Sequence, residues 1–403
     1  MKRELLIGSP YIVSENGKAR LCAELSIDGK TVYTAWYDVE EEFEKYLCSE
    51  RSDAFLVSLI LYAMREDMNI KCIAPVSKRL LYQLVSFIIP FYANTSKTYN
   101  HIEIFANSTI ENLETAKAVG TGISCGIDSL YSVFKNNAED SEYKVTHLCL
   151  FNNGTFGDFG GDEARKSYLK QLNFSKNISE KLGKKFVGVD TNINEFIKMI
   201  HYETHVFRSI SFVMALSKLF GTYYFASSYR IDELKPNINH FDSLELYNLS
   251  NLQTETLSLY SSGLEVTRLE KVEFLSDIEF VHNSLSVCFF EDVNCCKCEK
   301  CKRTIMQLYI LGKLDKFDKV FDMELVKNSF DSCFIDSIAM KENVFWRPIY
   351  EYLKLNHKYK LKHYIIGFAK SSALKNREKF LKLLNNKFIL TRYKKIKEKY
   401  NWR

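Results

Sequence analysis

From residue 118 onward, short apolar segments alternate with longer helical segments, and this alternation restricts the fold more than any other feature of the sequence. Parallel strands need crossover connections long enough to hold a helix, so the alternation predicts a parallel sheet. The predicted strands are Ala118–Ile123, Lys144–Phe151, Lys185–Val189 and Tyr223–Ala226. The predicted helices between them are Asp128–Asn136, Asp162–Leu182 and Phe207–Phe220, the last two followed by Gly183 and Gly221. We therefore expect an α/β fold with a doubly wound parallel sheet, in which ligands bind at the carboxyl ends of the strands.

The segments before and after this sheet predict two further domains. Residues 1–115 combine turn dipeptides, such as Asn16-Gly17, with predicted helices at 53–68 and 77–92, as a mixed α/β domain would. Almost everything after Arg303 is predicted to be helical. The chain of 403 residues suffices for two or three domains of roughly 100–200 residues. The predicted domains are 1–115, 116–305 and 306–403.

The net charge of +5 conceals an uneven distribution of charge along the chain. Residues 351–403 carry 16 basic and three acidic side chains, whereas residues 1–350 carry 39 basic and 47 acidic ones. Such a basic tail can bind an acidic partner such as tRNA or an acidic protein. Its lysines also interleave with apolar residues, as in 379–384, which favours amphipathic helices. We expect a solvated helical face and keep the docking of a partner as the alternative.

The sequence predicts a soluble cytoplasmic protein. Its first residues lack the apolar stretch of roughly 7–15 residues that a signal peptide needs. Its longest apolar runs, around 54–64 and 80–92, fall short of the roughly 18 residues of a membrane span. Five of the eleven cysteines fall within residues 288–301, which favours a local metal site in a reducing compartment over a disulfide framework.

The segment 124–129, Ser-Cys-Gly-Ile-Asp-Ser, lies between the first predicted strand and its helix. A loop in this position directs backbone N–H groups and the positive end of the helix toward an anion such as a phosphate. The hydroxyl groups of Ser124 and Ser129 can donate to phosphate oxygens, and Gly126 permits an unusual backbone conformation and close approach. Asp128 can hold Mg²⁺ or cap the helix. An ordinary capped turn without a ligand is the alternative.

Four cysteines, Cys288, Cys295, Cys298 and Cys301, have the spacing of a metal site. Two thiolates separated by two residues can reach one tetrahedral ion, and structural Zn²⁺ favours four such ligands. Cys296 is left over as a fifth thiol. An iron–sulfur cluster with the same ligands and a group of inert thiols are the alternatives.

The segment 124–129 resembles the Ser-Gly-Gly-x-Asp-Ser loop of the PP-loop ATP pyrophosphatases. With the cysteines that follow about 160 residues later, it is similar to the 7-cyano-7-deazaguanine synthases of queuosine biosynthesis and to their multi-domain relatives, some of which occur beside anti-phage systems. The resemblance covers roughly residues 118–305, and Cys125 and Cys296 stand where the family has glycine. It implies Zn²⁺ at the four cysteines and ATP with Mg²⁺ at Ser124, Cys125, Gly126, Ile127, Asp128 and Ser129.

Further candidate residues lie at the ends of the later predicted strands, namely Phe151, Asn152, Asp190, Thr191, Ser227 and Ser228. The resemblance places the first two near the adenine of ATP and the last two near its ribose or the substrate. The cations Arg268 and Lys271 can stabilise the leaving pyrophosphate, unless they belong to a solvated helix face.

Arg165 and Arg208 near predicted helix starts are further candidates for stabilising pyrophosphate, whereas His201 and His205 have no third metal ligand nearby and are interpreted as surface or core residues.

The resemblance implies that a carboxylate or amide oxygen attacks the α-phosphate of ATP, pyrophosphate leaves, and a nitrogen nucleophile displaces AMP. We expect Asp128, Ser129, Arg268 and Lys271 to carry this catalysis. The implied substrate is a 7-deazaguanine-type base, and the multi-domain relatives suggest a protein or tRNA acceptor held by the N-terminal domain or the basic tail. The alternatives are a nucleotide-sensing or RNA-binding module with a degenerate loop, and a tRNA-thiolating enzyme whose catalytic thiol would be Cys125 or one of the scattered cysteines.

Overall fold

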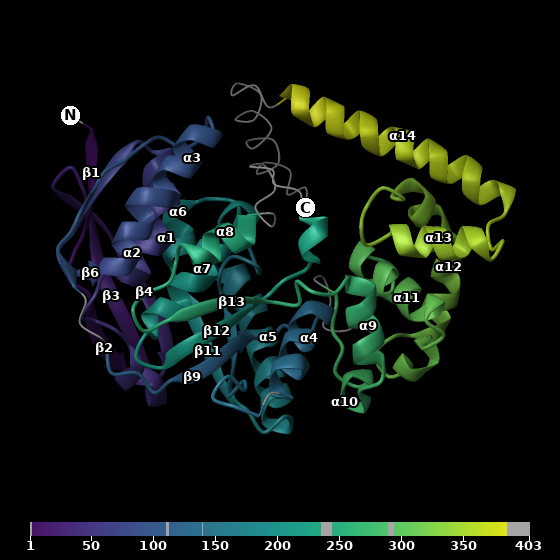
Figure 1. Cartoon of the computed structure of the whole chain (residues 1–403), viewed down its shortest axis with the longest axis horizontal. Coiled ribbons are helices and arrows are strands. Elements are labelled where there is room, and N and C mark those ends of the chain that lie inside the picture. Colours follow the sequence, from purple (N-terminus) through teal and green to yellow (C-terminus); the bar gives the residue numbers. More distant parts are fainter. Residues whose placement is uncertain (1, 110–112, 139, 235–243, 289–293, 385–403) are drawn as a thin grey trace. The chain divides into compact units, whose positions relative to one another are not determined.

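The computed structural model describes residues 2–109, 113–138, 140–234, 244–288 and 294–384, with side chains up to residue 377 (Figure 1). The chain divides into two compact units, Met1–Lys271 and Val272–Arg403. Each unit contains hydrophobic core residues of its own. Among the described residues, no helix combines the length and the apolar character needed to cross a membrane.

The first unit is built around one large sheet, to which eleven strands of the described residues contribute. These strands are β1 (Arg3–Ile7), β2 (Tyr11–Glu15), β3 (Lys18–Ile27), β4 (Lys30–Glu40), β5 (Met68–Cys72), β7 (Ile104–Phe105), β9 (Ala118–Gly122), β10 (His147–Phe151), β11 (Lys185–Thr191), β12 (Phe220–Ala226) and β13 (Ser258–Ser262). Their order is β13-β12-β9-β10-β11-β4-β3-β1-β5-β7, with β2 paired to β3. The short strands β6 (Val76–Ser77) and β8 (Ser108–Thr109) pair separately.

The strands from β13 to β11 in this order are all parallel. The order in which the chain adds strands to the sheet reverses at β9. The strands β10 and β11 follow on one side of β9, whereas β12 and β13 lie on the other. Ligands of open α/β sheets bind outside the carboxyl ends of the strands at such a reversal. The segment 124–129 follows β9 directly and therefore lies at this point of the sheet.

Helices cover both faces of the parallel strands (Figure 1). On one face, α4 contacts β9 through the hydroxyl groups of Ser132 and Thr121, 3.0 Å apart, and α5 lies beside it. On the other face, Phe151 of β10 stacks on Phe212 of α7, with ring centroids 5.0 Å apart. The helices of this unit are α1 (Asp53–Arg65), α2 (Lys78–Gln83), α3 (Ile89–Thr95), α4 (Ile127–Asn137), α5 (Asp162–Lys181), α6 (Ile193–Ile197), α7 (His201–Ala215) and α8 (Glu245–Ser250).

The predicted α/β class with a large parallel sheet is confirmed in the described residues, since six of the ten strand pairings in the large sheet are parallel. The helix predicted at Phe207–Phe220 is wrong at both ends, because α7 begins at His201 and ends at Ala215, and Phe220 begins β12. Gly221 therefore lies in a strand and does not close a helix. A Cβ atom on Gly221 would lie 3.3 Å from the Cα atom of Lys117, so glycine allows the chain to approach β9 closely here.

The predicted domain boundaries fall inside continuous structure. The boundary at 115–116 lies within the first unit, because β4 pairs antiparallel with β11 through Asp38 and Asp190 and through Tyr37 and Thr191. The boundary at 305–306 lies within the helix α11 (Glu299–Ile310).

The second unit is helical in the described residues, as the sequence predicts for the end of the chain. Its helices are α10 (Glu279–His282), α11, α12 (Met323–Ala339), α13 (Arg347–Leu355) and α14 (Leu361–Leu384), and α9 (Arg268–Ser276) spans the boundary between the units. Gly367 of α14 packs against Ile338 of α12, and Lys370 pairs with Asp336. Part of the basic tail is thus folded against α12, whereas the side chains of 379–384 and all of 385–403 lie outside the described residues.

The glycines of β9 provide a test of this packing. A Cβ atom on Gly120 would lie 2.6 Å from the Phe220 ring, whereas one on Gly122 meets only the Tyr223 hydroxyl, at 3.6 Å. We expect Gly120→Ala to lower the free energy of unfolding of the first unit by about 1–3 kcal/mol. The matched Gly122→Ala variant should be affected far less in the same urea titration, and equal losses in both variants would contradict the packing described here.

Candidate functional site

The loop between β9 and α4 forms a compact turn in which two serine hydroxyl groups face each other. The Oγ atoms of Ser124 and Ser129 lie 3.1 Å apart, and the Ser129 hydroxyl also donates to the Gly126 carbonyl at 3.1 Å. The backbone N–H of Gly126 points to the Ser124 hydroxyl at 3.4 Å. The α4 helix begins at Ile127, whose side chain is buried. The two hydroxyl groups and the start of α4 are therefore gathered in one place, as the sequence predicts.

The unusual backbone conformation in this loop belongs to Cys125 and not to Gly126. Gly126 has φ −80° and ψ 169°, an extended conformation that any residue adopts. Cys125 has φ +59°, in the left-handed region that favours glycine. The conformational role predicted for Gly126 is thus wrong. The left-handed conformation occurs one residue earlier, at Cys125, where the resembling family also has glycine.

The thiol of Cys125 is completely buried. Burial raises the pKa of this thiol to about 12. A cysteine at a helix N-terminus can have a lowered pKa, but here the loss of solvation outweighs that effect. Cys125 therefore carries a neutral thiol near pH 7, which argues against the reactive thiolate considered from the sequence.

Asp128, in the first turn of α4, is bound by two cations from a segment 140 residues further along the chain. Its Oδ2 atom accepts a hydrogen bond from Arg268 at 2.7 Å, and its Oδ1 atom lies 3.7 Å from the Lys271 ammonium. Both cations are almost completely buried, with exposed fractions of 5% and 0%. The alternative of a solvated helix face is therefore wrong for Arg268 and Lys271.

Lys271 lies in a closed environment behind the loop. Its ammonium donates to the Ser227 carbonyl at 2.6 Å and lies 5.7 Å from the centre of the Tyr131 ring. Gly263, with φ +92°, leaves the space that this side chain fills, since a Cβ atom there would lie 2.9 Å from the ammonium. Burial lowers the pKa of Lys271, and the attraction of Asp128 opposes this shift. Lys271 therefore acts on the site by positioning Asp128.

The turn after β12 belongs to the same cluster, as predicted for Ser227 and Ser228. The hydroxyl group of Ser228 donates to Asp128 Oδ2 at 3.3 Å, and the backbone N–H of Ser227 binds the Ser262 carbonyl of β13. Residues from the two strands on either side of the reversal are thus joined through one carboxylate. Glu245 and Glu265 also attract the Lys271 ammonium, so the positive charge of this cluster is shared among several carboxylates.

Two predicted residues lie apart from this cluster. The Phe151 ring is buried in the core between Phe212 and Tyr223, so the structure does not support contact of this ring with adenine. Asn152 is buried and donates to Asp190 Oδ1 at 2.7 Å. Asn152 therefore belongs to a second polar network at the ends of β10 and β11.

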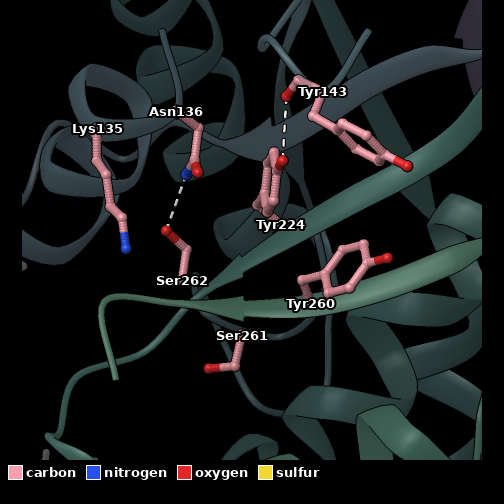
Figure 2. A pocket seen from close by; sticks show the side chains of 7 residues that line it. All are labelled: Lys135, Asn136, Tyr143, Tyr224, Tyr260, Ser261 and Ser262. Atoms are coloured by element: carbon pink, nitrogen blue, oxygen red, sulfur yellow. Dashed lines mark hydrogen bonds between the residues drawn. The ribbon is translucent and has the colours of Figure 1, made fainter. Parts of the chain in front are cut away.

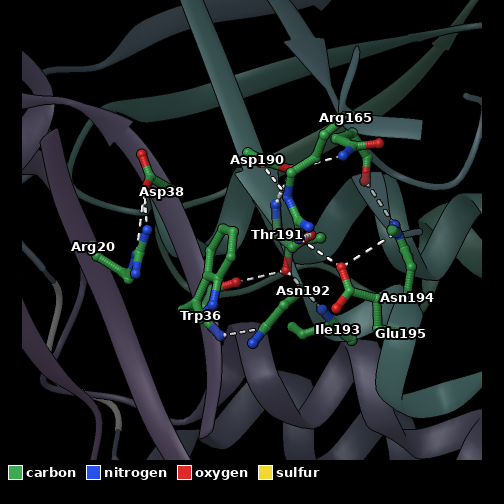
Figure 3. A network of polar contacts seen from close by, with 12 residues as sticks. Arg20, Trp36, Asp38, Arg165, Asp190, Thr191, Asn192, Ile193, Asn194 and Glu195 are labelled. Atoms are coloured by element: carbon green, nitrogen blue, oxygen red, sulfur yellow. Dashed lines mark hydrogen bonds and ion pairs between the residues drawn. The ribbon is translucent and has the colours of Figure 1, made fainter. Parts of the chain in front are cut away.

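The second network joins the N-terminal strands to the parallel strands (Figure 3). Arg165 of α5 binds Asp190 at 3.1 Å and Glu195 at 2.6 Å, and its guanidinium lies 5.3 Å from the centre of the Trp36 ring of β4. The Thr191 hydroxyl donates to the Trp36 carbonyl at 2.6 Å. The charge of Arg165 is thus balanced by carboxylates.

Arg208 is also directed away from the loop. It is 1% exposed and donates to the carbonyl groups of Asn153, Asp158 and Met199, at 3.3, 3.0 and 2.6 Å. His201 accompanies it, with Nδ1 3.0 Å from the Asn153 carbonyl. Both residues hold the glycine-rich segment after β10 in place.

Sequence reasoning missed Tyr131 and Glu265 near the cluster. The Tyr131 hydroxyl donates to Glu265 at 3.0 Å, and Lys135 pairs with the same carboxylate. Tyr131 follows Asp128 by three residues on a helix, so the helical spacing alone places both side chains on one face. That spacing is the signal that would have found Tyr131.

Comparison with protein families, curated proteins and solved structures finds no match to this chain.

The four predicted cysteines come together in the second unit. The sulfur atoms of Cys288, Cys295, Cys298 and Cys301 all lie within 4.8 Å of one another, so this group can hold a metal ion such as zinc. Cys298 caps the start of α11, where its sulfur accepts from the N–H of Cys301 at 3.4 Å, and the Cys295 sulfur accepts from the N–H of Cys298 at 3.3 Å. Such N–H···S contacts stabilise thiolates, the form that binds metals.

The fifth cysteine points elsewhere. The Cys296 thiol is buried and donates to the Asn294 carbonyl at 3.3 Å. Its backbone has φ +56°, in the left-handed region, and its sulfur is not part of the group of four. The choice of four ligands made from the spacing is therefore confirmed by the geometry.

These neighbours provide a matched test of the metal site. We expect the purified chain to hold about one metal ion, and Cys295→Ala to lose most of it, because a structural site needs four ligands. Cys296→Ala should retain the metal, measured by elemental analysis after dialysis. Equal metal loss in the two variants would contradict the ligand set.

Alkylation tests the state of Cys125. In the folded protein at pH 8, we expect iodoacetamide to leave Cys125 unmodified, because the thiol is buried and its pKa is about 12. After unfolding, the same thiol should react fully, as followed by mass spectrometry of its peptide. Rapid modification of the folded protein would restore the reactive-thiolate interpretation.

Proposed function

We propose that this protein is an ATP-dependent enzyme of the PP-loop type, which adenylates a carboxylate or an amide and passes it to a nitrogen nucleophile. The observation that carries the proposal is the convergence of the loop 124–129, Asp128 with its two buried cations, and Ser228 at the reversal of strand order beside β9. Helices on both faces and this reversal support a doubly wound sheet.

The chemistry assigned to the loop follows from its groups. The Ser124 and Ser129 hydroxyl groups and the N–H groups at the start of α4 would bind the β- and γ-phosphates of ATP. Asp128 offers one carboxylate, and nucleotide-bound Mg²⁺ uses one or two carboxylates together with the phosphates, so the residues fit this ion. Mg²⁺ would neutralise charge on the phosphates.

Arg268 would complete this arrangement. Its contact holds Asp128 in a fixed position, and its positive charge would favour the charge that develops on pyrophosphate. Catalysis would rest on positioning and charge neutralisation, without a covalent nucleophile.

The substrate belongs to the proposal as well. By the resemblance to the 7-cyano-7-deazaguanine synthases, it would be a 7-deazaguanine-type carboxylate, with ammonia or an amine of a protein or tRNA as the nucleophile, in the cytoplasm and in biosynthesis or anti-phage defence. Zn²⁺ at the four cysteines would stabilise the second unit.

One observation favours a nucleotide-binding module without turnover as a second candidate. Asp128 is already bound by Arg268 and Lys271, and both cations would compete with Mg²⁺ for its oxygens. A thiolating enzyme that uses Cys125 is not supported, because the Cys125 thiol is neutral and buried.

The proposal is tested with the full chain, ATP, Mg²⁺, 7-carboxy-7-deazaguanine and ammonium. We expect AMP and pyrophosphate to form, and Asp128→Ala and Arg268→Ala each to lower the rate about a hundredfold, as the loss of one preorganised charged group does. Arg3→Ala, an exposed arginine paired with Asp28, serves as the matched control and should retain the rate.

Titration calorimetry with ATP·Mg²⁺ separates the two candidates. ATP binding that depends on Ser129 but yields no product over hours with any acid tested would favour the module without turnover. Identical ATP binding by the wild-type chain and by Ser129→Ala and Asp128→Ala variants would refute both.

A further inference from the structure

A pocket lies in the first unit, and no residue of the loop 124–129 lines it (Figure 2). Its volume is about 190 Å³, and three of its seven lining residues are tyrosines, Tyr143, Tyr224 and Tyr260. Lys135 and Asn136 from the end of α4 complete it together with the end of β13. Lys135 follows Asp128 by seven residues, or about 10 Å along the helix, and shares Glu265 with Tyr131, so the pocket borders the Asp128 cluster without containing Asp128.

The pocket exists because α4 covers only part of its side of the sheet. Thr121, Tyr224 and Tyr260 lie in register on β9, β12 and β13 and therefore share one face. Thr121 is buried beneath Ser132 of α4, Tyr224 is half-buried, and Tyr260 is 47% exposed. The two paired tyrosines thus form an aromatic surface that α4 does not cover.

The Tyr224 ring is held by contacts with both other tyrosines of the pocket. The Tyr224 hydroxyl donates to the Tyr143 carbonyl at 3.0 Å, which ties the segment before β10 to β12. The Tyr224 and Tyr260 rings lie 6.0 Å apart between centroids, and Tyr143 is 45% exposed. A preformed surface of this kind loses little conformational entropy when a flat ligand stacks on it.

Polar groups line the other side of the pocket. The Asn136 amide donates to the Ser262 hydroxyl at 2.9 Å, and Ser261 donates to the Glu245 carboxylate. Lys135 adds a cation, paired with Glu265 at the rim. The aromatic faces suit a flat heterocycle, and the amide and hydroxyl groups suit its hydrogen-bonding edge. The one cation suits a phosphate attached to that heterocycle.

We propose that this pocket binds a nucleobase, supplied either by a free nucleoside or nucleotide or by an unpaired base of single-stranded RNA. The base stacks on Tyr260 and Tyr143, its edge meets Asn136 and Ser262, and Lys135 lies where a phosphate would follow. This site does not depend on the loop 124–129, so the proposal stands apart from the proposed ATP chemistry.

The test uses uridine, adenosine and a fluorescent octamer of uridine RNA as probes of the full chain. We expect Tyr260→Ala and Tyr143→Ala to weaken binding about tenfold, as the loss of one stacking ring does, in saturation-transfer NMR for the nucleosides and in anisotropy for the RNA. Tyr260→Phe keeps the ring and should retain binding, which separates loss of stacking from misfolding.

Two control variants complete the design. Tyr82→Ala removes an exposed tyrosine elsewhere in the first unit, and Arg268→Ala disturbs the Asp128 cluster; neither should change uridine binding. Nucleoside binding with this pattern supports a free ligand, and binding of the octamer alone with the same pattern supports RNA. Absence of binding by every probe, or binding unchanged in both alanine variants of the pocket, overturns the proposal.

Discussion

Two buried cations require a counter-charge, and Asp128 is the carboxylate that both reach in the described structure. Lys271 has no exposed surface and Arg268 almost none, so removal of this carboxylate would leave buried charge at a cost of about 3–5 kcal/mol. The contacts of Asp128, Arg268 and Lys271 hold three segments together, namely the first turn of α4, the turn at Ser227–Ser228 and the start of α9. The shape of the loop 124–129 is therefore maintained by the protein itself before any ligand arrives.

The loop 124–129 and the four-cysteine segment each contain a cysteine whose backbone has the left-handed conformation. Cys125 lies in the loop and Cys296 beside the four metal-binding thiols, and both occupy positions where the resembling family has glycine. A residue with a Cβ atom pays roughly 1–2 kcal/mol for this conformation. Both thiols are buried, so the apolar surface that they bury offsets part of that cost.

The features that could be predicted from the sequence are those with a local signal. Alternation of strands and helices and the spacing of Cys295, Cys298 and Cys301 act over a few residues. The α/β class with a large, mostly parallel sheet and the grouping of the cysteines are confirmed. The pairing of β4 with β11 joins Asp38 to Asp190, and no local pattern encodes so distant a contact. The same holds for Arg268, which looks like part of an exposed charged helix until its partner 140 residues earlier is known. The prediction that Gly221 ends a helix is wrong because glycine occurs both at helix ends and where strands approach their neighbours closely.

The antiparallel pairing of β4 with β11 has a structural consequence. The parallel strands and the N-terminal strands share hydrogen bonds across this seam, reinforced by Thr191 and Asn192 binding the backbone of β4. The end of β11 is therefore connected to the N-terminal strands by direct hydrogen bonds. Without its N-terminal neighbour, β11 would present a bare row of N–H and C=O groups, which is a template for aggregation. The N-terminal strands are therefore part of the same sheet as the parallel strands. Substitutions in β4 must preserve its pairing with β11.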